Sequence, residues 1–327
     1  MLRAFGARPG SKVYVNTTPA SVIPRGSGPK IFRELLFGKE KRKPTGAVPI
    51  VTPTWGDAQG LNVVWLGHAT ALVEIEGKRV LIDPVWSLRC SPFSWAGPRR
   101  LHPMPTAIEQ LPELDAILIS HDHYDHLDMP TVVRLTSTSK AVFLVPRGVG
   151  AHLRVWGVPA DRVVEFDWNQ SYSLGGVELI LTEARHFSGR GFKRDRTLWG
   201  SWVIAGQRHK VFYTGDTGYF PGFAEIGSQH GPFDITLIQI GAYSPYWPDI
   251  HMMPDEAIAT HLDVQGGLLI PVHWATFNLA LHSWSEPVDK IWSAAKEREI
   301  TLAVPRPGER VIANDPVEVD GWWQALA

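Results

Sequence analysis

Residues 121–126, with the sequence His-Asp-His-Tyr-Asp-His, place three imidazoles and the carboxylate of Asp125 within six positions. Histidine is the commonest metal ligand in proteins, and carboxylate oxygens beside it suit zinc or a similar divalent ion. In extended backbone the H-x-H pair puts both imidazoles on one side, and a tight bend can then turn Asp125 and His126 back toward them. Donors that point in two directions from one loop indicate two adjacent metal ions rather than one.

Short apolar runs are expected to bring these and other donors to one place. Residues 116–119 have the length and composition of a buried strand and end just before the motif. Three other apolar runs each deliver one histidine or aspartate at their carboxyl end. Together with the motif they give seven donors, enough for two zinc ions with three unshared protein ligands each and one bridging carboxylate. The three added residues are His186 after 177–182, Asp216 after 211–214 and His273 after 268–272.

The hydrophobic pattern predicts more strands than helices, with the helices between groups of strands. Residues 61–83 predict three strands with a turn at Gly77, and Pro84 ends the last one because it cannot donate a ladder hydrogen bond. This order favours two sheets face to face with helices outside over a doubly wound parallel sheet. Further strands are expected at 141–145, 162–166, 177–182, 201–205, 210–214, 235–240, 268–272 and 301–304, and helices at 129–135, 148–155, 222–227, 254–262 and 287–298.

The bulk composition indicates a soluble globular protein of 327 residues. Its formal net charge of −1 gives no global basic field, so we expect no nucleic-acid partner. Cys90 is the single cysteine, which excludes an intrachain disulfide, and no apolar run is long enough for a membrane-spanning helix. We expect a cytoplasmic protein, with peripheral contact to a membrane and homo-oligomer formation left open.

Residues 1–60 differ from the rest because they are rich in Pro, Gly, Ser and Lys. We predict that they form an N-terminal arm wrapping a single metallo-hydrolase domain, residues 61–327. The apolar spacing of residues 31–37 predicts one short helix in the arm. Residues 91–105 are too long for a simple connection, and we expect this loop to form a substrate wall.

Several longer motifs follow one another in order along the chain. They resemble those of the metallo-β-lactamase superfamily and, more narrowly, its N-acylphosphatidylethanolamine-hydrolysing phospholipase D group (NAPE-PLD-like). The resemblance extends from about residue 61 to residue 289, and the arm does not obviously match. It implies an α/β fold, the αβ/βα sandwich of two facing sheets with helices outside, and a dinuclear metal site at one edge. The motifs are Trp65–Thr70, Leu81–Pro84, Ala96–Leu101, Ser120–Asp128, Leu198–Trp202, Thr214–Tyr219, Gln239–Tyr243 and Val272–Phe277.

The resemblance also implies a role for each metal ligand. One zinc would be held by three histidines, a second by an aspartate and two histidines, and one aspartate would bridge the two ions. The first set is His121, His123 and His186, the second is Asp125, His126 and His273, and the bridge is Asp216.

Other residues match positions around these metals. Asp83 resembles a strand-end carboxylate that supports the site by accepting a hydrogen bond from a ligand imidazole. Tyr124 and His251 match positions that could contact a phosphate. His68 and Asp122 are left open between a supporting and a purely structural role. The predicted catalytic residues are Asp125, Asp216, Tyr124 and His251.

The predicted reaction follows from two Zn²⁺ ions that share one water. Metals about 3.5–4 Å apart lower the pKa of that water toward neutrality and provide a bridging hydroxide that can attack phosphorus in line. Neither a nucleophilic serine motif nor a histidine adjacent to Cys90 is present. We therefore predict a zinc-dependent hydrolase of phospholipase D type, which cleaves a phosphodiester in a phospholipid similar to N-acylphosphatidylethanolamine or in a smaller molecule.

Two other functions use the same residues. The protein could open a lactone or another carbonyl compound, as ascorbate-phosphate lactonase-like relatives do, or it could bind metal without catalysis. The aromatic loop 92–95, the apolar residues 35–37 of the arm helix and Tyr246–Trp247 would together form an apolar lip if exposed, and this lip would favour a lipid substrate. The alternative interpretation is that these residues are ordinary core.

Overall fold

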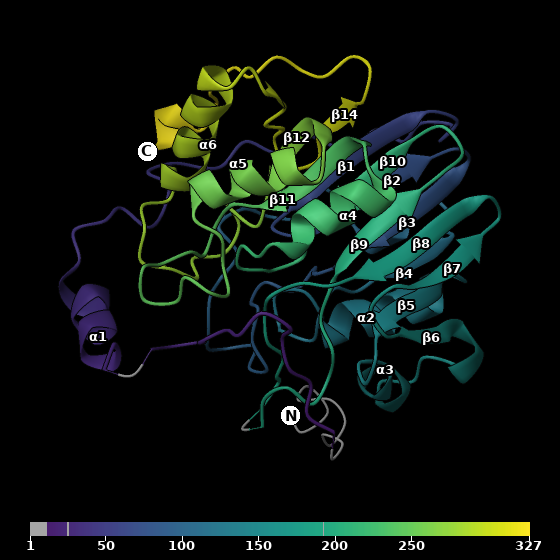
Figure 1. Ribbon diagram of the computed structural model, residues 1–327, viewed down its shortest axis with the longest axis horizontal. Coiled ribbons are helices and arrows are strands. Elements are labelled where there is room, and N and C mark those ends of the chain that lie inside the picture. Colours follow the sequence, from purple (N-terminus) through teal and green to yellow (C-terminus); the bar gives the residue numbers. More distant parts are fainter. Residues whose placement is uncertain (1–11, 25, 192) are drawn as a thin grey trace.

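A computed structural model describes residues 12–24, 26–191 and 193–327, and residues 1–11 of the predicted arm lie outside this range. The chain forms two facing sheets of seven strands each (Figure 1). Across the first sheet the strands are β14 (Arg310–Ile312), β1 (Leu61–Gly67), β2 (Thr70–Ile75), β3 (Lys78–Ile82), β4 (Ala116–Leu118), β5 (Val142–Pro146) and β6 (Val163–Phe166). Across the second they are β13 (Thr301–Leu302), β12 (Gly266–Val272), β11 (Phe233–Gln239), β10 (Lys210–Tyr213), β9 (Ser201–Ala205), β8 (Val177–Thr182) and β7 (Gln170–Leu174).

Helices cover the outer faces of both sheets, which confirms the predicted α/β sandwich (Figure 1). Two helices pack on the first sheet, three lie on the side of the second, and one belongs to the arm. They are, in that order, α2 (Met129–Thr138) and α3 (Gly150–Val155); α4 (Gly222–His230), α5 (Pro254–Asp263) and α6 (Glu286–Glu297); and α1 (Gly28–Phe37).

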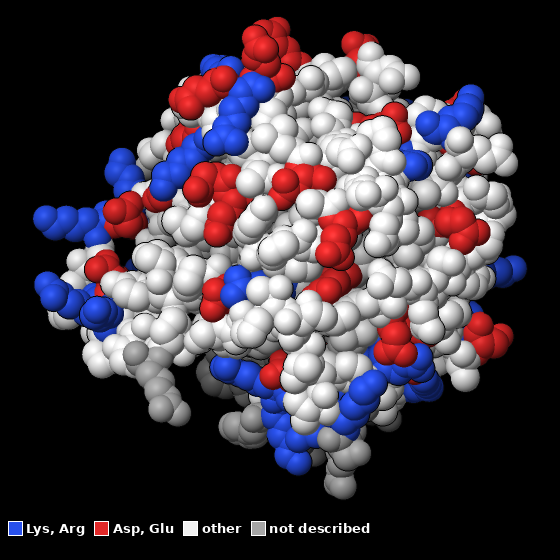
Figure 2. Space-filling view, in the orientation of Figure 1, with Lys and Arg blue, Asp and Glu red and all other residues white. Residues whose placement is uncertain are grey.

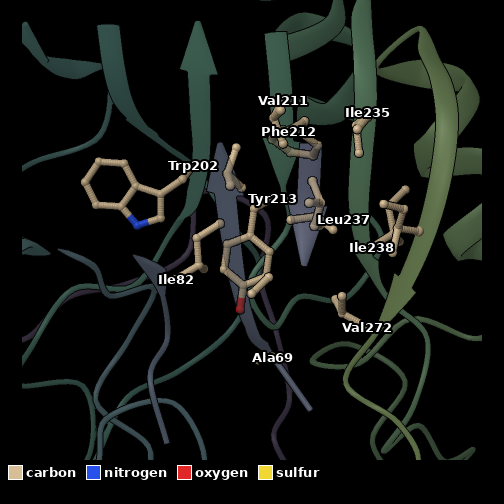
Figure 3. Packing of buried hydrophobic residues seen from close by; sticks show 14 of the residues in the cluster. Ala69, Ile82, Trp202, Val211, Phe212, Tyr213, Ile235, Leu237, Ile238 and Val272 are labelled. Carbon is tan, nitrogen blue, oxygen red and sulfur yellow. The ribbon is translucent and has the colours of Figure 1, made fainter. Parts of the chain in front are cut away.

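Alternate residues of the first sheet enter two separate hydrophobic clusters. In β1, Val63 and Trp65 pack between the two sheets, whereas Val64 and Leu66 pack toward α2 and α3. Every residue of β1 is buried for this reason, and apart from Asn62 the strand is free of polar side chains. Figure 3 shows the cluster between the sheets, where Ile82 of β3 lies beside residues of the second sheet.

The strand directions bring several carboxyl ends to one edge of the sandwich. Strands β3, β4 and β5 are parallel, and so are β10, β11 and β12. Strand β8 runs in the same direction as β10, because both are antiparallel to β9 between them. The residues that follow β3, β4, β8, β10 and β12 therefore meet at this edge.

Two strands were not predicted, and both lie at sheet edges. Strand β7, with the sequence QSYSL, is mostly polar and exposed, and β14 has only three residues. Neither has an apolar run that a sequence pattern could detect. No helix in the described ranges is long and apolar enough to cross a membrane. The domain boundary at residue 61 stays a prediction.

Candidate metal centre

Three residues at the shared edge adopt backbone conformations that are costly for residues with a side chain. His68 between β1 and β2, Asp83 after β3 and His273 after β12 have φ angles of 54°, 37° and 64°. Such conformations persist only where the surrounding structure determines them, and they cluster at functional sites. A backbone hydrogen bond of 2.9 Å from His273 N to His68 O joins two of these turns across the sheets.

His121, His123 and His186 form a first group of donors. Two of them lie in the loop after β4 and the third follows β8, so both sheets contribute. His123 Nδ1 lies 2.8 Å from His121 Nε2 and 3.3 Å from His186 Nε2. The ligand atoms of the three residues lie within 4.8 Å of one another, close enough to bind a common metal ion.

A second group consists of Asp125, His126, His273 and His68. Asp125 Oδ2 lies 3.5 Å from His126 Nε2 and 3.2 Å from His273 Nε2. His68 Nε2 is the nearest nitrogen, at 2.9 Å from the same oxygen. The sequence left the role of His68 open, and the structure places its buried imidazole in direct contact with a predicted ligand.

Asp216 lies between the two groups. Its Oδ2 is 3.1 Å from His126 Nε2 and 3.8 Å from His121 Nε2, and its Oδ1 is 3.2 Å from His273 Nε2. Within the described part of the chain, Asp216 Oδ1 and His126 Nε2 are buried and form no hydrogen bond of good geometry, although each has an ionisable neighbour within 3.2 Å. Buried oxygen and nitrogen atoms that face one another in this way fit a pair of divalent ions that share Asp216. The structure thus brings all seven predicted ligands together.

Asp83 supports the second group from behind. Its carboxylate accepts hydrogen bonds from Ser120 N, at 2.7 Å, and from the hydroxyls of Ser120 and Tyr213. His126 Nδ1 lies 2.7 Å from Asp83 Oδ2, so the other ring nitrogen of His126 is directed at Asp216. Figure 3 shows the ring of Tyr213 reaching past Ile82 from the second sheet. Neither Ser120 nor Tyr213 was predicted to support the site, although both lie at the ends of apolar runs.

The charges within the cluster compensate one another. Burial lowers the pKa of His121, which keeps its imidazole neutral. Burial also disfavours the charged form of His273, but Asp216 and Asp125 outweigh it and raise its pKa to about 9. The same two carboxylates raise the pKa of His126 well above its usual value despite burial. Conversely, His126 and His273 hold the pKa of Asp216 well below its usual range although the carboxyl is buried.

Zinc binding to the metal-free protein is therefore expected to release protons at pH 7. A metal-bound imidazole must be neutral, whereas pH 7 lies below the pKa of about 9 of His273, so this ring carries a proton that zinc has to displace. Proton release should decline as the pH rises through that pKa. Titration calorimetry in buffers of different ionisation enthalpy measures it, and a buffer-independent enthalpy at pH 7 would contradict the expectation.

The two predicted phosphate contacts, His251 and Tyr124, differ in their surroundings. His251 Nε2 lies 3.8 Å from Asp216 Oδ2, at the margin of the donor cluster. Burial lowers the pKa of His251 to about 4, so the ring is neutral at pH 7. The hydroxyl of Tyr124 donates to Arg190 O at 2.6 Å, and the guanidinium of Arg190 lies over the Tyr124 ring. Tyr124 must therefore release this carbonyl before it can donate to a substrate.

Asp122, whose role the sequence left open, is directed at a loop rather than at the other donors. Its carboxylate accepts a hydrogen bond of 2.7 Å from Gly189 N, and Arg190 Nη1 donates to its carbonyl oxygen at 2.8 Å. These bonds attach the loop after His186 to the histidine motif. Cys90 is buried, and burial raises the pKa of its thiol, which agrees with the expectation that it is not a nucleophile.

The residues of the predicted apolar lip are only partly brought together. A cavity of about 430 Å³ has Phe93, Trp95 and Tyr124 among its lining residues. Trp95 is 72% exposed. Trp247 is partly buried, and its Nε1 donates to Ala242 O at 2.8 Å, so this ring has a structural contact. The arm helix and residues 246–247 do not line this cavity.

The two-sheet fold and the histidine–aspartate clusters at its edge define a metal-dependent hydrolase fold. Residues 78–274, more than half of the chain, match the family described as Beta-lactamase superfamily domain. The solved structure of Igni18, a metallo hydrolase from Ignicoccus hospitalis, is similar with a TM-score of 0.58, and the match covers 77% of this chain and 97% of that one. At 23% identity this likeness concerns the fold alone.

Two relatives place the chain more narrowly. An uncharacterized protein of Mycobacterium tuberculosis is 51% identical over 318 residues, which cover 95% of this chain and 86% of that protein. The N-acyl-phosphatidylethanolamine-hydrolyzing phospholipase D 1 of Caenorhabditis elegans is 38% identical over 253 residues, 73% of this chain and 71% of that enzyme. The chain therefore belongs to the metallo-β-lactamase superfamily and, within it, to the NAPE-PLD-like group, as the sequence motifs predicted.

Proposed function

We propose that the protein is a dinuclear zinc phosphodiesterase of phospholipase D type, with a substrate similar to N-acylphosphatidylethanolamine. The observation that carries this proposal is the pair of donor groups that share Asp216 at the carboxyl edge of the two sheets. The similarity to the C. elegans phospholipase supports the substrate class. The metal-dependent hydrolase fold is the established part. That the metal is zinc, that the bond is a phosphodiester and that the substrate is a lipid are parts of the proposal.

The positions of the candidate ligands support two metal ions, each with its own set of ligands. Divalent ions bound there act as Lewis acids on a phosphoryl oxygen and lower the pKa of water toward neutrality. The protein contributes fixed donors, a bridging carboxylate and buried surroundings that strengthen electrostatic interactions. We assign His121, His123 and His186 to one ion, Asp125, His126 and His273 to the other, and Asp216 to both.

We propose that His251 and Tyr124 bind the phosphate of the substrate. Because His251 is neutral at pH 7, one of its ring nitrogens carries a hydrogen that can donate to a phosphoryl oxygen. His251 Nε2 lies 3.8 Å from Asp216 Oδ2, beside the carboxylate that we propose as the bridge. Tyr124 borders both the histidine motif and the cavity of Phe93 and Trp95, so it can act where the phosphate meets the rest of the lipid.

The arm helix α1 supports peripheral binding to a membrane. No residue of α1 is buried, and its Phe32 and Leu36, one turn apart, are 64% and 58% exposed. Phe37 at its end is 76% exposed. Lys30 and Arg33 belong to the helix itself. Figure 2 shows further basic side chains at the left of the molecule, with acidic ones among them. An amphipathic helix with an apolar face and basic flanks binds the interface of anionic lipids.

The test compares a lipid substrate with a small one. The zinc-loaded protein should release phosphatidic acid from N-acylphosphatidylethanolamine in vesicles that contain anionic lipid, and it should also cleave bis-(p-nitrophenyl) phosphate. The double variant Phe32→Ser/Phe37→Ser should lose about tenfold or more of the lipid turnover, because apolar burial at the interface is lost. Its turnover of the small diester should stay near that of the unmodified protein.

A matched control is Val133→Ser, which removes an exposed apolar side chain from α2. It should leave both activities unchanged. A parallel loss of both activities in the arm variant would contradict the membrane role. Hydrolysis of lactones without cleavage of either diester would contradict the phosphodiesterase and support the carbonyl-hydrolase alternative.

A further inference from the structure

Residues 14–21 of the arm lie across the segment that delivers the predicted ligand His186 (Figure 1). We call these residues the strap. Tyr14 N donates to Asp195 O at 2.9 Å near one end, and Ser21 N donates to Asp249 Oδ2 at 2.9 Å at the other. Between them, Arg185 Nε donates to Pro19 O at 3.1 Å. The strap is therefore attached to two loops beside the metal centre, the one between β8 and β9 and the one between β11 and α5.

Asn16 is the strap residue that forms hydrogen bonds with the predicted metal ligand His186. Its Nδ2 donates to His186 O at 2.8 Å, and its Oδ1 accepts from His186 N at 3.0 Å. The same Oδ1 accepts from Trp199 Nε1 at 3.1 Å. One side chain thus pairs with both polar backbone groups of a buried residue 170 positions further along the chain, as a neighbouring strand would.

The ring of His186 is fixed independently of its backbone. Its Nδ1 lies 2.9 Å from Ile250 O, so its Nε2 is the nitrogen left for the metal centre, 3.3 Å from His123 Nδ1. The backbone bonds set where the Cα–Cβ bond starts, and the bond to Ile250 sets how the ring is turned. With Asn16 removed, only the second of these restraints remains.

We propose that Asn16 is a positioning residue, through which the strap retains the metal ion held by His121, His123 and His186. This inference rests on the proposed metal assignment, and it concerns a segment that the family motifs do not include. Supporting partners around a metal ligand typically change its affinity by about 10–100-fold. Since Asn16 contacts a member of one ligand set only, its loss should weaken the binding of one ion and leave the binding of the other unchanged.

Zinc release distinguishes the two ions. Protein loaded with zinc is mixed with an excess of a chromophoric chelator, and the two equivalents are followed over time. In Asn16→Ala, one equivalent should leave about tenfold faster or more, and the other at the rate of the unmodified protein. Asn16→Asp keeps the two accepted bonds but sets its second carboxylate oxygen against His186 O, so one equivalent should again leave faster than in the unmodified protein.

The matched control is Thr17→Val, which removes the bond from the neighbouring strap residue to Glu183 without touching His186. It should release both equivalents at the rate of the unmodified protein. The visible spectrum of the cobalt-substituted protein should change in Asn16→Ala and not in Thr17→Val, because the spectrum reports ligand geometry.

Two outcomes would overturn the inference. One is a release curve of Asn16→Ala that superimposes on that of the unmodified protein. The other is equal acceleration of both equivalents with a lower Tm, which would mean general destabilisation. Failure of the unmodified protein to bind two zinc equivalents would instead refute the proposed metal assignment, so the two ideas fail separately.

Discussion

Asp216→Asn is expected to lower kcat/KM for phosphodiester cleavage by about 10³-fold or more, beyond the 10–100-fold typical for a residue that only supports a ligand. Among the described residues, Asp216 is the carboxylate that contacts both donor groups. An amide keeps its shape but removes the negative charge that two dications require, and it can turn an N–H toward His126 or His273. Kinetics at equal protein concentration, together with elemental analysis of bound zinc, measure the effect.

The control for this prediction is His68→Ala. His68 contacts Asp125 through one bond of 2.9 Å and lies outside the seven predicted ligands, so its loss should fall within the supporting range. Because His68 touches a predicted ligand, His68→Ala should itself lower activity. The gap between Asp216→Asn and His68→Ala should therefore be smaller than it would be if His68 lay away from the site. Equal losses in kcat at equal zinc content would contradict the assignment of Asp216 as the shared ligand.

Asp83→Asn is expected to lower zinc affinity and kcat by about 10–100-fold. The carboxylate of Asp83 accepts from two groups of Ser120 and from Tyr213, and it faces His126 Nδ1. An asparagine there would place N–H groups opposite donors and leave buried groups unpaired, which costs about 1–3 kcal/mol each. A lower Tm should accompany the loss of zinc affinity.

Tyr213→Phe separates support of the metal ligand from general packing. It removes one donor to Asp83 and keeps the ring in the cluster between the sheets. Its effect on zinc affinity should be clearly smaller than that of Asp83→Asn, because His126 keeps its partner. If the two substitutions cost the same, the hydroxyl of Tyr213 and not the pairing with His126 would be the essential feature.

The clustering of the seven candidate ligands could be predicted because each follows an apolar run that is locally recognisable. His186, Asp216 and His273 come after strands whose parallel directions bring their carboxyl ends together, and this rule needs no coordinates. The two sheets were inferred from the order of strands and helices along the chain. The missed strands β7 and β14 are polar or short, and their place depends on pairing with β8 and β1 rather than on their own composition.

Other parts of the site depend on contacts that no local pattern records. The contact of His68 with Asp125 requires a left-handed turn between β1 and β2, and a sequence does not reveal φ at a histidine. Asn16 lies in a polar segment and meets His186 across 170 positions. Trp247 was predicted as a lip residue because it lies in an aromatic loop, but its hydrogen bond to Ala242 gives that ring a structural contact.

The division of the ligands between the two sheets has a consequence for how the chain is held together. Asp125 and His273 are 148 positions apart, and ions shared by such ligands would close loops of that length. Closing a long loop restricts the unfolded chain, as a disulfide does, and the cost of loop closure grows only slowly with length. With a single cysteine, this chain has no intrachain disulfide. Metal ions would take the place of disulfides as long-range cross-links in this chain. These cross-links would form or break with the availability of the metal and not with oxidation.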